Sequence, residues 1–463
     1  MAYDSATVEY FCFAKARVQF LSGEDTPRAF LERGISSIEK REREVRAFVS
    51  LDLEAARVAA DAATERWRAG RPLSLVDGLP FAVKDCYDVA GFPTRVNSAL
   101  FDDAPPARAD AAHVDALRRG GALFVGKTVT TELTMAAPGP TWNPWDLSRT
   151  PGGSSSGSAA AVAAHMVPLA TGSQVRGSGL RPASICGIPA LKPTFGALSR
   201  VGGFDPSPSL NHLVLLAGTL ADIWDSANQI ARVVGGDPGE APWAPDDTLP
   251  APRRPLRLAR QYTVGWDKTD ADSKAVFEGF LAKLAATGVE IVEPKDGPLF
   301  ARYEDLTSRV LEFFFDLLLW EIRSPLIALA AAQPEAFSET MHRHIANAAK
   351  LTLADYVRAL ARRDELRAAH AALEGEVDGF ITLAHIGPGQ LGQPPLGTPW
   401  YNDASSAVGA PTINLPVLAV EGLPLGVQLM GFPGADAALM GQARWVLERF
   451  APGTVGILSD NLV

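Results

Sequence analysis

Residues 150–165, TPGGSSSGSAAAVAAH, place glycines and hydroxyl side chains directly before an alanine-rich run. Glycine and serine are poor helix formers and alanine is the best one, so the stretch predicts a loop that opens onto a helix. Such a junction brings free backbone N–H groups together with hydroxyl groups. The stretch therefore suits a flexible linker, a cradle for phosphate or part of a catalytic site.

A second Gly/Ser stretch lies downstream, where Ser178 stands between two glycines in LATGSQVRGSGLRPASICGIPALKPTFG (169–196). Upstream, Lys84 is the one lysine in the apolar stretch GLPFAVKDCYDVAGFPT (78–94). Burial disfavours the charged ammonium and makes a lysine a usable base, and a serine becomes nucleophilic when a base lies near it. These residues could supply a nucleophile, a base, a relay hydroxyl and N–H donors. Tight turns and a lysine that reaches solvent would explain the same residues equally well.

The stretch GALFVGKT (121–128) matches the phosphate-binding pattern G-x-x-x-x-G-K-[ST]. That pattern needs a flexible loop after a strand and before a helix. Here the residues between the glycines are Ala-Leu-Phe-Val, which predict a strand, and a helix is predicted before Gly121. The sequence therefore disfavours nucleotide binding.

The stretch GSSSG (153–157) matches the G-x-S-x-G turn of α/β-hydrolases. That turn follows a strand and needs a downstream acid and histidine, whereas the preceding residues here predict a turn. His212 and His385 are the candidate histidines, and a structural role is the simpler interpretation of each. His342 and His344 do not share a helix face, so a metal site is not predicted.

Four stretches together resemble the amidase signature family: GLPFAVKD (78–85), residues 126–164, residues 172–196 and GLPLGVQLMG (422–431). The resemblance is close over residues 75–215 and looser over 380–450. It implies one α/β/α fold with a large mixed sheet and a Ser–cis-Ser–Lys triad. It also implies hydrolysis of a C–N bond next to a carbonyl through an acyl-enzyme, with no cofactor and no metal.

Carried over by position, the resemblance makes Ser178 the nucleophile, Ser154 the cis-serine that relays the proton, and Lys84 the base. It implies a cis peptide bond between Gly153 and Ser154, and gives the next two serines of the loop roles in hydrogen bonding only. The backbone N–H groups of the oxyanion hole would be those of Val175, Arg176, Gly177 and Ser178.

The chain departs from the family pattern before the nucleophile. Gln174 replaces an acidic residue, a change that accompanies an arginine directly before proline in a subset of the family, as in Arg181-Pro182 here. Arg176 replaces a glycine. Its side chain is expected either to bind an anionic or carbonyl-rich substrate or to lie in solvent. Thr134 and Met135 are expected to line the substrate pocket.

The remainder of the chain predicts an α/β protein, because strand and helix patterns alternate along it. We expect residues 1–463 to form a single domain, with N-terminal helices in 1–70, the signature core in 75–215 and a helical insertion in 300–375. The apolar run 310–322 predicts a buried helix that walls the pocket, although a superficial membrane contact is an alternative. Together with Trp142, Trp145 and Trp400, that run favours a bulky apolar substrate.

Composition limits the partners of the chain. The net charge of −10 disfavours nucleic-acid binding, and three cysteines in 463 residues fit a reducing cytoplasm. The N-terminal residues lack the order of a signal peptide, and no run is long enough for a membrane span. We expect a cytoplasmic monomer or homodimer that acts on a small-molecule amide or carbamate.

Several functions stay open within this resemblance. The chemistry serves amides other than peptides, carbamates (a urethanase activity), urea-like compounds and esters. The amidase subunit of a tRNA-dependent amidotransferase is an alternative, although that subunit usually carries the acidic residue that Gln174 replaces. A non-catalytic binding protein on the same fold is a further one.

Overall fold

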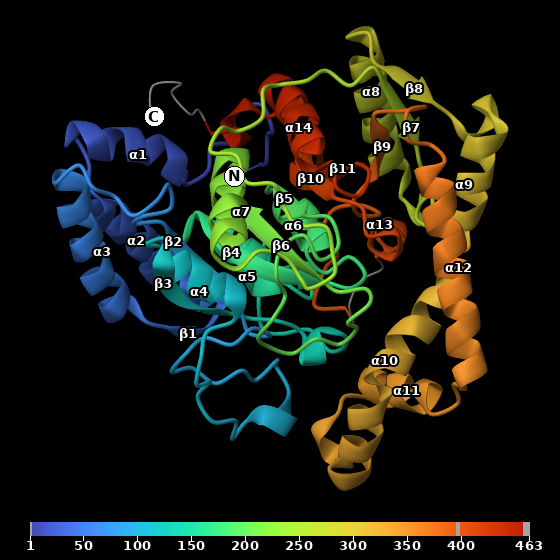
Figure 1. Ribbon diagram of the computed structural model, residues 1–463, viewed down its shortest axis with the longest axis horizontal. Coiled ribbons are helices and arrows are strands. Elements are labelled where there is room, and N and C mark those ends of the chain that lie inside the picture. The colour runs from blue at the N-terminus through green and yellow to red at the C-terminus, as the bar shows by residue number, and fades with distance from the viewer. Residues whose placement is uncertain (1, 395–398, 457–463) are drawn as a thin grey trace.

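The computed structural model describes residues 2–394 and 399–456, and eleven of its strands form one sheet (Figure 1). The order across the sheet is β1-β3-β2-β4-β6-β5-β10-β11-β9-β7-β8. The strands are β1 (Phe48–Leu51), β2 (Pro80–Lys84), β3 (Leu123–Thr128), β4 (Leu169–Gln174), β5 (Ala190–Lys192), β6 (His212–Ala217), β7 (Arg257–Arg260), β8 (Glu290–Val292), β9 (Gly379–Leu383), β10 (Thr412–Val420) and β11 (Leu423–Met430).

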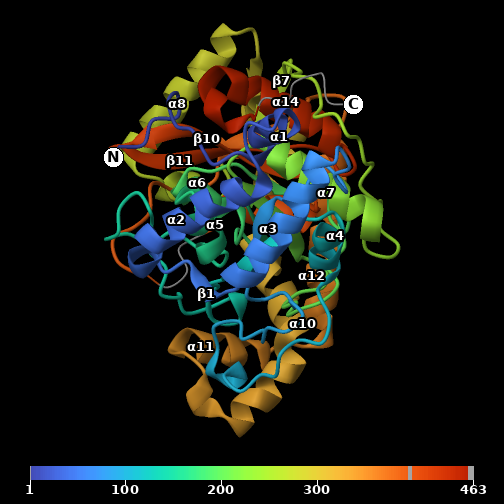
Figure 2. The same cartoon turned by 90° about the vertical axis from the view of Figure 1, so that its left-hand side faces the viewer.

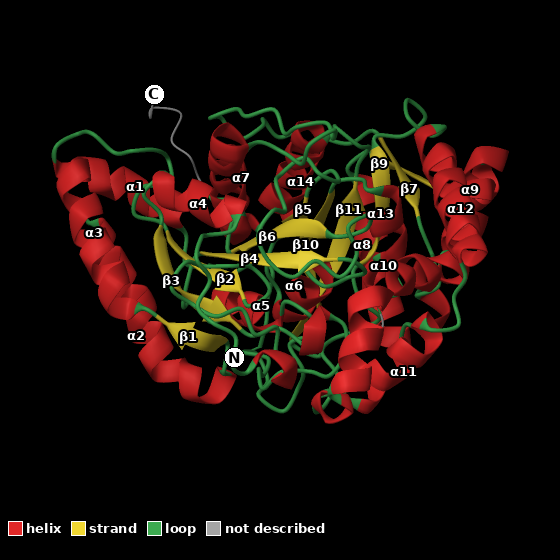
Figure 3. Ribbon diagram, turned by 60° about the horizontal axis from the view of Figure 1, so that its bottom comes forward, coloured by secondary structure: helices red, strands yellow, loops and turns green. Residues whose placement is uncertain are grey.

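Helices cover both faces of this sheet, and Figure 3 shows α7 and α14 on one side and α5 and α6 on the other. The helices are α1 (Phe13–Ser22), α2 (Pro27–Val45), α3 (Leu53–Arg68), α4 (Ala112–Arg119), α5 (Ser156–Ala163), α6 (Leu180–Cys186), α7 (Leu220–Val234), α8 (Ala271–Ala286), α9 (Pro298–Ser308), α10 (Leu311–Ala332), α11 (Glu339–Ala348), α12 (Leu353–Ala371), α13 (Asp403–Val408) and α14 (Asp436–Phe450). The predicted α/β/α class with a central sheet is confirmed.

The sheet is mixed. β3, β2 and β4 run parallel to one another, as do β9, β7 and β8, and the remaining neighbours are antiparallel. Val83 of β2 pairs with Thr171 of β4, so the carboxyl ends of these two strands lie together. This register brings Lys84, the last residue of β2, next to the end of β4.

The small residues of the Gly/Ser loop and of α5 are required by close packing. Every residue of α5 is buried, and the helix contacts β2, β3 and β4. A Cβ at Gly157 would lie 2.2 Å from the carbonyl oxygen of Ala47 and 2.4 Å from the backbone nitrogen of Val129. A larger residue would force α5 away from the sheet, because contacts this short do not occur between real Cβ atoms and backbone.

The N-terminal third contains a strand that the sequence pattern did not predict. Residues 1–70 were expected to be helical, and α2 does begin after the Thr26 cap with Pro27 at its first position. Between α2 and α3, however, β1 pairs antiparallel with β3 at the edge of the sheet. β3 itself extends to Thr128, three residues beyond the predicted strand 122–125.

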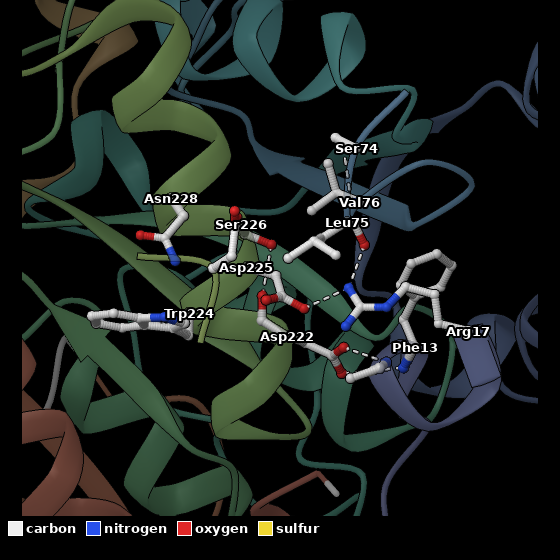
Figure 4. Close-up of polar contacts among 12 residues, drawn as sticks. Phe13, Arg17, Ser74, Leu75, Val76, Asp222, Trp224, Asp225, Ser226 and Asn228 are labelled. Atoms are coloured by element: carbon white, nitrogen blue, oxygen red, sulfur yellow. Dashed lines mark hydrogen bonds and ion pairs between the residues drawn. The ribbon is translucent and has the colours of Figure 1, made fainter. Parts of the chain in front are cut away.

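Helix α1 is joined to α7 by a buried polar cluster (Figure 4). Asp222 accepts hydrogen bonds from the backbone N–H groups of Phe13 and Ala14, at 3.2 and 2.8 Å. Arg17 forms an ion pair with Asp225 at 2.7 Å, and each of these two side chains is only 3% exposed. The arginine also donates to the carbonyl oxygen of Leu75 at 2.6 Å, so one side chain fastens α1 to two other segments.

The segment 298–371 forms helices α9 to α12, which lie together at one end of the molecule (Figures 1 and 2). Helix α10 packs on both α11 and α12. The apolar run 310–322 lies in α10, where Phe314, Leu317 and Ile322 are buried. Among residues 2–394 and 399–456, no helix combines the length and apolar character needed to cross a bilayer.

Candidate active site

Lys84 is fully buried at the carboxyl end of β2. Its Nζ lies 2.6 Å from the Oγ of Ser154 and 2.8 Å from the Oγ of Ser173, which stands on the adjacent strand β4. Burial lowers the pKa of this lysine to about 8, the Cys86 thiol acts in the opposite direction, and the charge of Arg181 lowers it further. A substantial fraction of the lysine is therefore neutral near neutral pH, as a base must be.

Ser154 lies in a loop that is held from two sides. The peptide bond between Gly153 and Ser154 is cis, as the resemblance implied. The Gly153 carbonyl oxygen accepts hydrogen bonds from Nε and Nη2 of Arg181, the former at 3.0 Å. The backbone N–H of Ser155 donates to the carbonyl oxygen of Ser178 at 3.0 Å, so this loop is joined directly to the second Gly/Ser loop.

The next two serines of the loop contact backbone. The Ser155 hydroxyl lies 3.4 Å from both the N–H and the carbonyl oxygen of Ser173, and the Ser156 hydroxyl donates to the Val129 carbonyl at 3.4 Å. These contacts match the hydrogen-bonding roles expected for both side chains.

Ser178 is 9% exposed and lies on the wall of a cavity of about 220 Å³. Ser154 and Ser173 share this wall. Its other members come from the loop after β3, the second Gly/Ser loop, α6, α10, α11 and the segment before α13: Thr134, Met135, Val175, Arg176, Arg181, Phe315, Leu318, Thr340, His344 and Pro399. The cavity thus joins the Gly/Ser loops to the helical segment, and Thr134 and Met135 lie where substrate is expected.

The loop between β4 and α6 presents the four residues expected to form the oxyanion hole. In the part of the chain that the structure describes, the backbone N–H groups of Gly177 and Ser178 donate no hydrogen bond. A Cβ at Gly177 would lie 2.4 Å from Oδ1 of Asn402 and 2.8 Å from Cβ of Pro399. Glycine is needed at this position because the segment before α13 packs directly on the loop.

The Arg176 side chain makes a contact that neither sequence interpretation anticipated. Its Nε and Nη2 form a bidentate ion pair with the buried carboxylate of Asp403, both at 2.7 Å. The guanidinium also lies over the ring of Phe315, 4.4 Å from its centroid. With 19% of the side chain exposed, Arg176 is a wall of the cavity and is not free in solvent.

Gln174 supports the same loop. Its Oε1 accepts hydrogen bonds from the backbone N–H groups of Gly179 and Leu180, at 3.1 and 3.0 Å, at the start of α6. Its Nε2 donates to the hydroxyl of Ser406, which in turn donates to the Arg176 carbonyl at 2.9 Å. An amide at this position therefore links the loop to α13 in a way that an ionised carboxylate, which only accepts hydrogen bonds, could not.

The structure gives no support to the other motif interpretations. The stretch 121–128 lies largely in β3, and a Cβ at Gly126 would lie 2.3 Å from the carbonyl oxygen of Ser50, so this glycine serves packing. His212 and His385 are buried, contact the backbone carbonyl groups of Gln174 and Gly387, and are absent from the cavity wall. Among the described residues no cluster of His, Cys, Asp or Glu could hold a metal ion.

Sequence reasoning missed four residues that surround the triad candidates. Ser173, Arg181 and Asp403 contact Lys84, Gly153 and Arg176 respectively, and His344 lines the cavity. Ser173 and Arg181 stand within a few residues of Ser178, so their position was a signal. Asp403 stands 227 residues from Arg176, and no pattern in the chain connects them.

Comparison with known proteins assigns the class. A family model described as Amidase matches residues 29–440. The amidase component of glutamyl-tRNA(Gln) amidotransferase from Chloroflexus aggregans is 31% identical over 478 residues, which cover 94% of this chain and 95% of that protein. AtzE, a component of the 1-carboxybiuret hydrolase of Pseudomonas sp. (strain ADP), is 42% identical over 209 residues, covering 43% and 44% of the two chains. The solved structure of native peptide amidase from Stenotrophomonas maltophilia has a TM-score of 0.80 at 25% identity and covers 95% of this chain and 96% of its own.

The fold and the family match define an amidase-type hydrolase that acts on C–N bonds. The chain belongs to the amidase signature family.

Proposed function

We propose that this protein hydrolyses the C–N bond next to a carbonyl group in a small amide, carbamate or urea-like compound, through an acyl-enzyme formed on Ser178. The observation that carries the proposal is the fully buried Lys84, 2.6 Å from the hydroxyl of Ser154, at a cavity whose wall includes both Ser154 and Ser178. A base, a relay hydroxyl and a nucleophile are the parts that acyl transfer by serine requires.

In the proposed reaction, neutral Lys84 takes the proton of Ser154 while Ser154 takes that of Ser178, whose Oγ attacks the carbonyl carbon. The backbone N–H groups of residues 175–178 stabilise the oxyanion, and each such donor contributes about 3 kcal/mol in other enzymes. Ser154 then passes a proton to the leaving nitrogen, because an amine is a poor leaving group unless protonated. Water attacks the acyl-enzyme by the reverse relay, and no step needs a metal or a cofactor.

The cavity supports a small substrate rather than a peptide. Its volume of about 220 Å³ is below the roughly 300 Å³ at which pockets for drug-sized ligands begin. Met135, Phe315 and Leu318 give it apolar walls, whereas Trp142, Trp145 and Trp400 are not among its lining residues. The expectation of a bulky substrate, which relied partly on these tryptophans, is accordingly dropped in favour of a short one.

The amidase subunit of a tRNA-dependent amidotransferase is the second candidate function. It is supported by the 31% identity to a protein of that kind over 94% of the chain. Gln174, with its bonds to α6 and α13, replaces the acidic residue expected for that subunit. Co-purification of a second subunit on which activity depends would favour this function over that of a self-sufficient amidase acting as a cytoplasmic monomer or homodimer.

The test is a hydrolysis screen with amides, carbamates and esters that share one acyl group, with products identified by mass spectrometry. Ser178→Ala should abolish turnover of every substrate that the wild type cleaves, while Ser155→Ala serves as the matched control one residue beyond the relay. Cleavage of esters alone would support an ester hydrolase, and carbamate cleavage would support a urethanase. Absence of any cleavage with the folded wild type, or full activity of Ser178→Ala, would overturn the proposal.

A further inference from the structure

The cavity beside Ser178 is lined by positive charge in a chain that is acidic as a whole. The protein has a formal net charge of −10, yet the described residues of the cavity wall include Arg176 and Arg181 and no aspartate or glutamate. Acidic residues outnumber basic ones elsewhere, so this reversal of sign is a property of the cavity itself.

Arg181 is the more deeply buried of the two arginines, with 2% of its surface exposed. Its Nε and Nη2 both donate to the Gly153 carbonyl oxygen, whereas its Nη1 has no hydrogen-bond partner among the described residues. Burial lowers the pKa of this guanidinium to about 9, and the charge of Arg176 lowers it further. A buried cation with an unsatisfied donor is unfavourable unless a counter-charge reaches it.

Asp403 is the carboxylate closest to this pair of arginines in electrostatic effect, since it is the acid that raises the pKa of Arg181. Arg176 already holds both of its oxygens, with Nε on Oδ1 and Nη2 on Oδ2. Nη1 of Arg176 takes no part in this ion pair. Two guanidinium groups therefore share one carboxylate, and one positive charge at the cavity is left over.

We propose that the substrate carries a carboxylate, which the guanidinium groups of Arg181 and Arg176 bind while Ser178 attacks the amide or carbamate carbonyl of the same molecule. This inference rests on the proposed function and narrows its substrate class. The cavity has the room of about seven water molecules, so the carboxylate and the scissile carbonyl are separated by only a few atoms. The half-amide of a short dicarboxylic acid has this chemistry.

The direct test compares two amides of nearly equal shape on the wild-type enzyme. Succinamate carries a carboxylate, and 4-oxopentanamide replaces that carboxylate with a neutral methyl ketone; both release ammonia, so one assay measures both. A charge-assisted hydrogen bond to a buried arginine predicts a kcat/KM at least about tenfold, and up to about a hundredfold, higher for succinamate. Equal values, or a preference for the neutral amide, would overturn the inference.

Variants assign the preference to the two arginines. Arg181→Met and Arg176→Met should each reduce the ratio of kcat/KM for succinamate to that for 4-oxopentanamide, and Arg181→Lys should retain part of it by keeping the charge. Arg119→Met removes the same charge from an exposed side chain that pairs with Asp115, so it should leave the ratio unchanged. A ratio that survives both methionine variants would place the anion elsewhere and refute the assignment.

Binding to Ser178→Ala keeps the inference testable if Arg181→Met does not fold. Calorimetry should show tighter binding of succinamate than of 4-oxopentanamide, and equal affinities would contradict the inference. A fluorophosphonate separates the two levels of the argument. Labelling of Ser178 together with equal turnover of the two amides would refute the carboxylate site and leave the hydrolase standing, whereas no labelling and no turnover would refute the hydrolase.

Discussion

The pH dependence of the rate follows from the burial of Lys84. If neutral Lys84 is the base, the rate rises with pH through its pKa of about 8 and reaches a plateau above it. At pH 7 about a tenth of the lysine is neutral, compared with about three in ten thousand for a lysine at the ordinary value of 10.5. Burial thus increases the neutral fraction at pH 7 by roughly 300-fold, which is the magnitude that the site contributes to its own base.

The assay is kcat/KM for ammonia release between pH 6 and 10, for the wild type and for Lys84→Arg. Arginine keeps a long cationic side chain but stays protonated, so this variant should be inactive at every pH in the range. A flat or falling wild-type profile, or a Lys84→Arg enzyme with wild-type activity, would refute the assignment of Lys84 as a neutral base.

The same shift can be checked without turnover. Between about pH 8 and 10.5 the unfolded chain still binds a proton that folded Lys84 has lost, so folding becomes more favourable as pH rises across this window. The difference in unfolding free energy between the wild type and Lys84→Met should therefore change by up to about 3 kcal/mol in favour of the wild type. A difference that is independent of pH would show that the lysine titrates normally in the fold.

Three further changes test other parts of the structure. Asp403→Asn removes the charge partner of Arg176 and should lower the unfolding free energy by about 1–3 kcal/mol, less than for a fully enclosed pair because Arg176 is 19% exposed; unchanged urea unfolding would contradict the ion pair. Arg17→Met leaves Asp225 buried without its partner and should cost about 3–5 kcal/mol in urea unfolding, with normal kinetics per folded molecule; a loss below about 1 kcal/mol would argue against this anchor of α1. Gly177→Ala places a Cβ 2.4 Å from a side-chain oxygen and should lower kcat by at least about tenfold by displacing the N–H donors, and wild-type kcat would show that this loop does not hold the oxyanion.

The sequence pattern was sufficient for the elements that carry strong local signals. Thr26 and Pro27 mark the start of α2, and the alternation of strands and helices indicates the layered α/β class. β1 escaped notice because its four residues lie between two helices and form an edge strand, which has little pattern of its own. Its place in the sheet depends on pairing with β3, and pairing is not encoded locally.

The candidate site divides in the same way. The resemblance located Lys84, Ser154 and Ser178 because each stands in a recognisable stretch. The contact of Ser173 with Lys84 depends on the parallel register of β2 and β4, and the pairing of Arg176 with Asp403 depends on how the segment before α13 packs on the second Gly/Ser loop. Both contacts arise from tertiary structure, so spacing along the chain could not reveal them.

The central claim is that Ser178 is the nucleophile, and covalent labelling tests it most directly. The wild type is treated with a fluorophosphonate, digested and mapped by mass spectrometry, with Ser178→Ala treated in parallel. The account predicts one adduct on the peptide that contains Ser178, its loss in Ser178→Ala, and slower labelling in Lys84→Ala. An adduct on Ser155 instead, or undiminished labelling of Ser178→Ala, would contradict it.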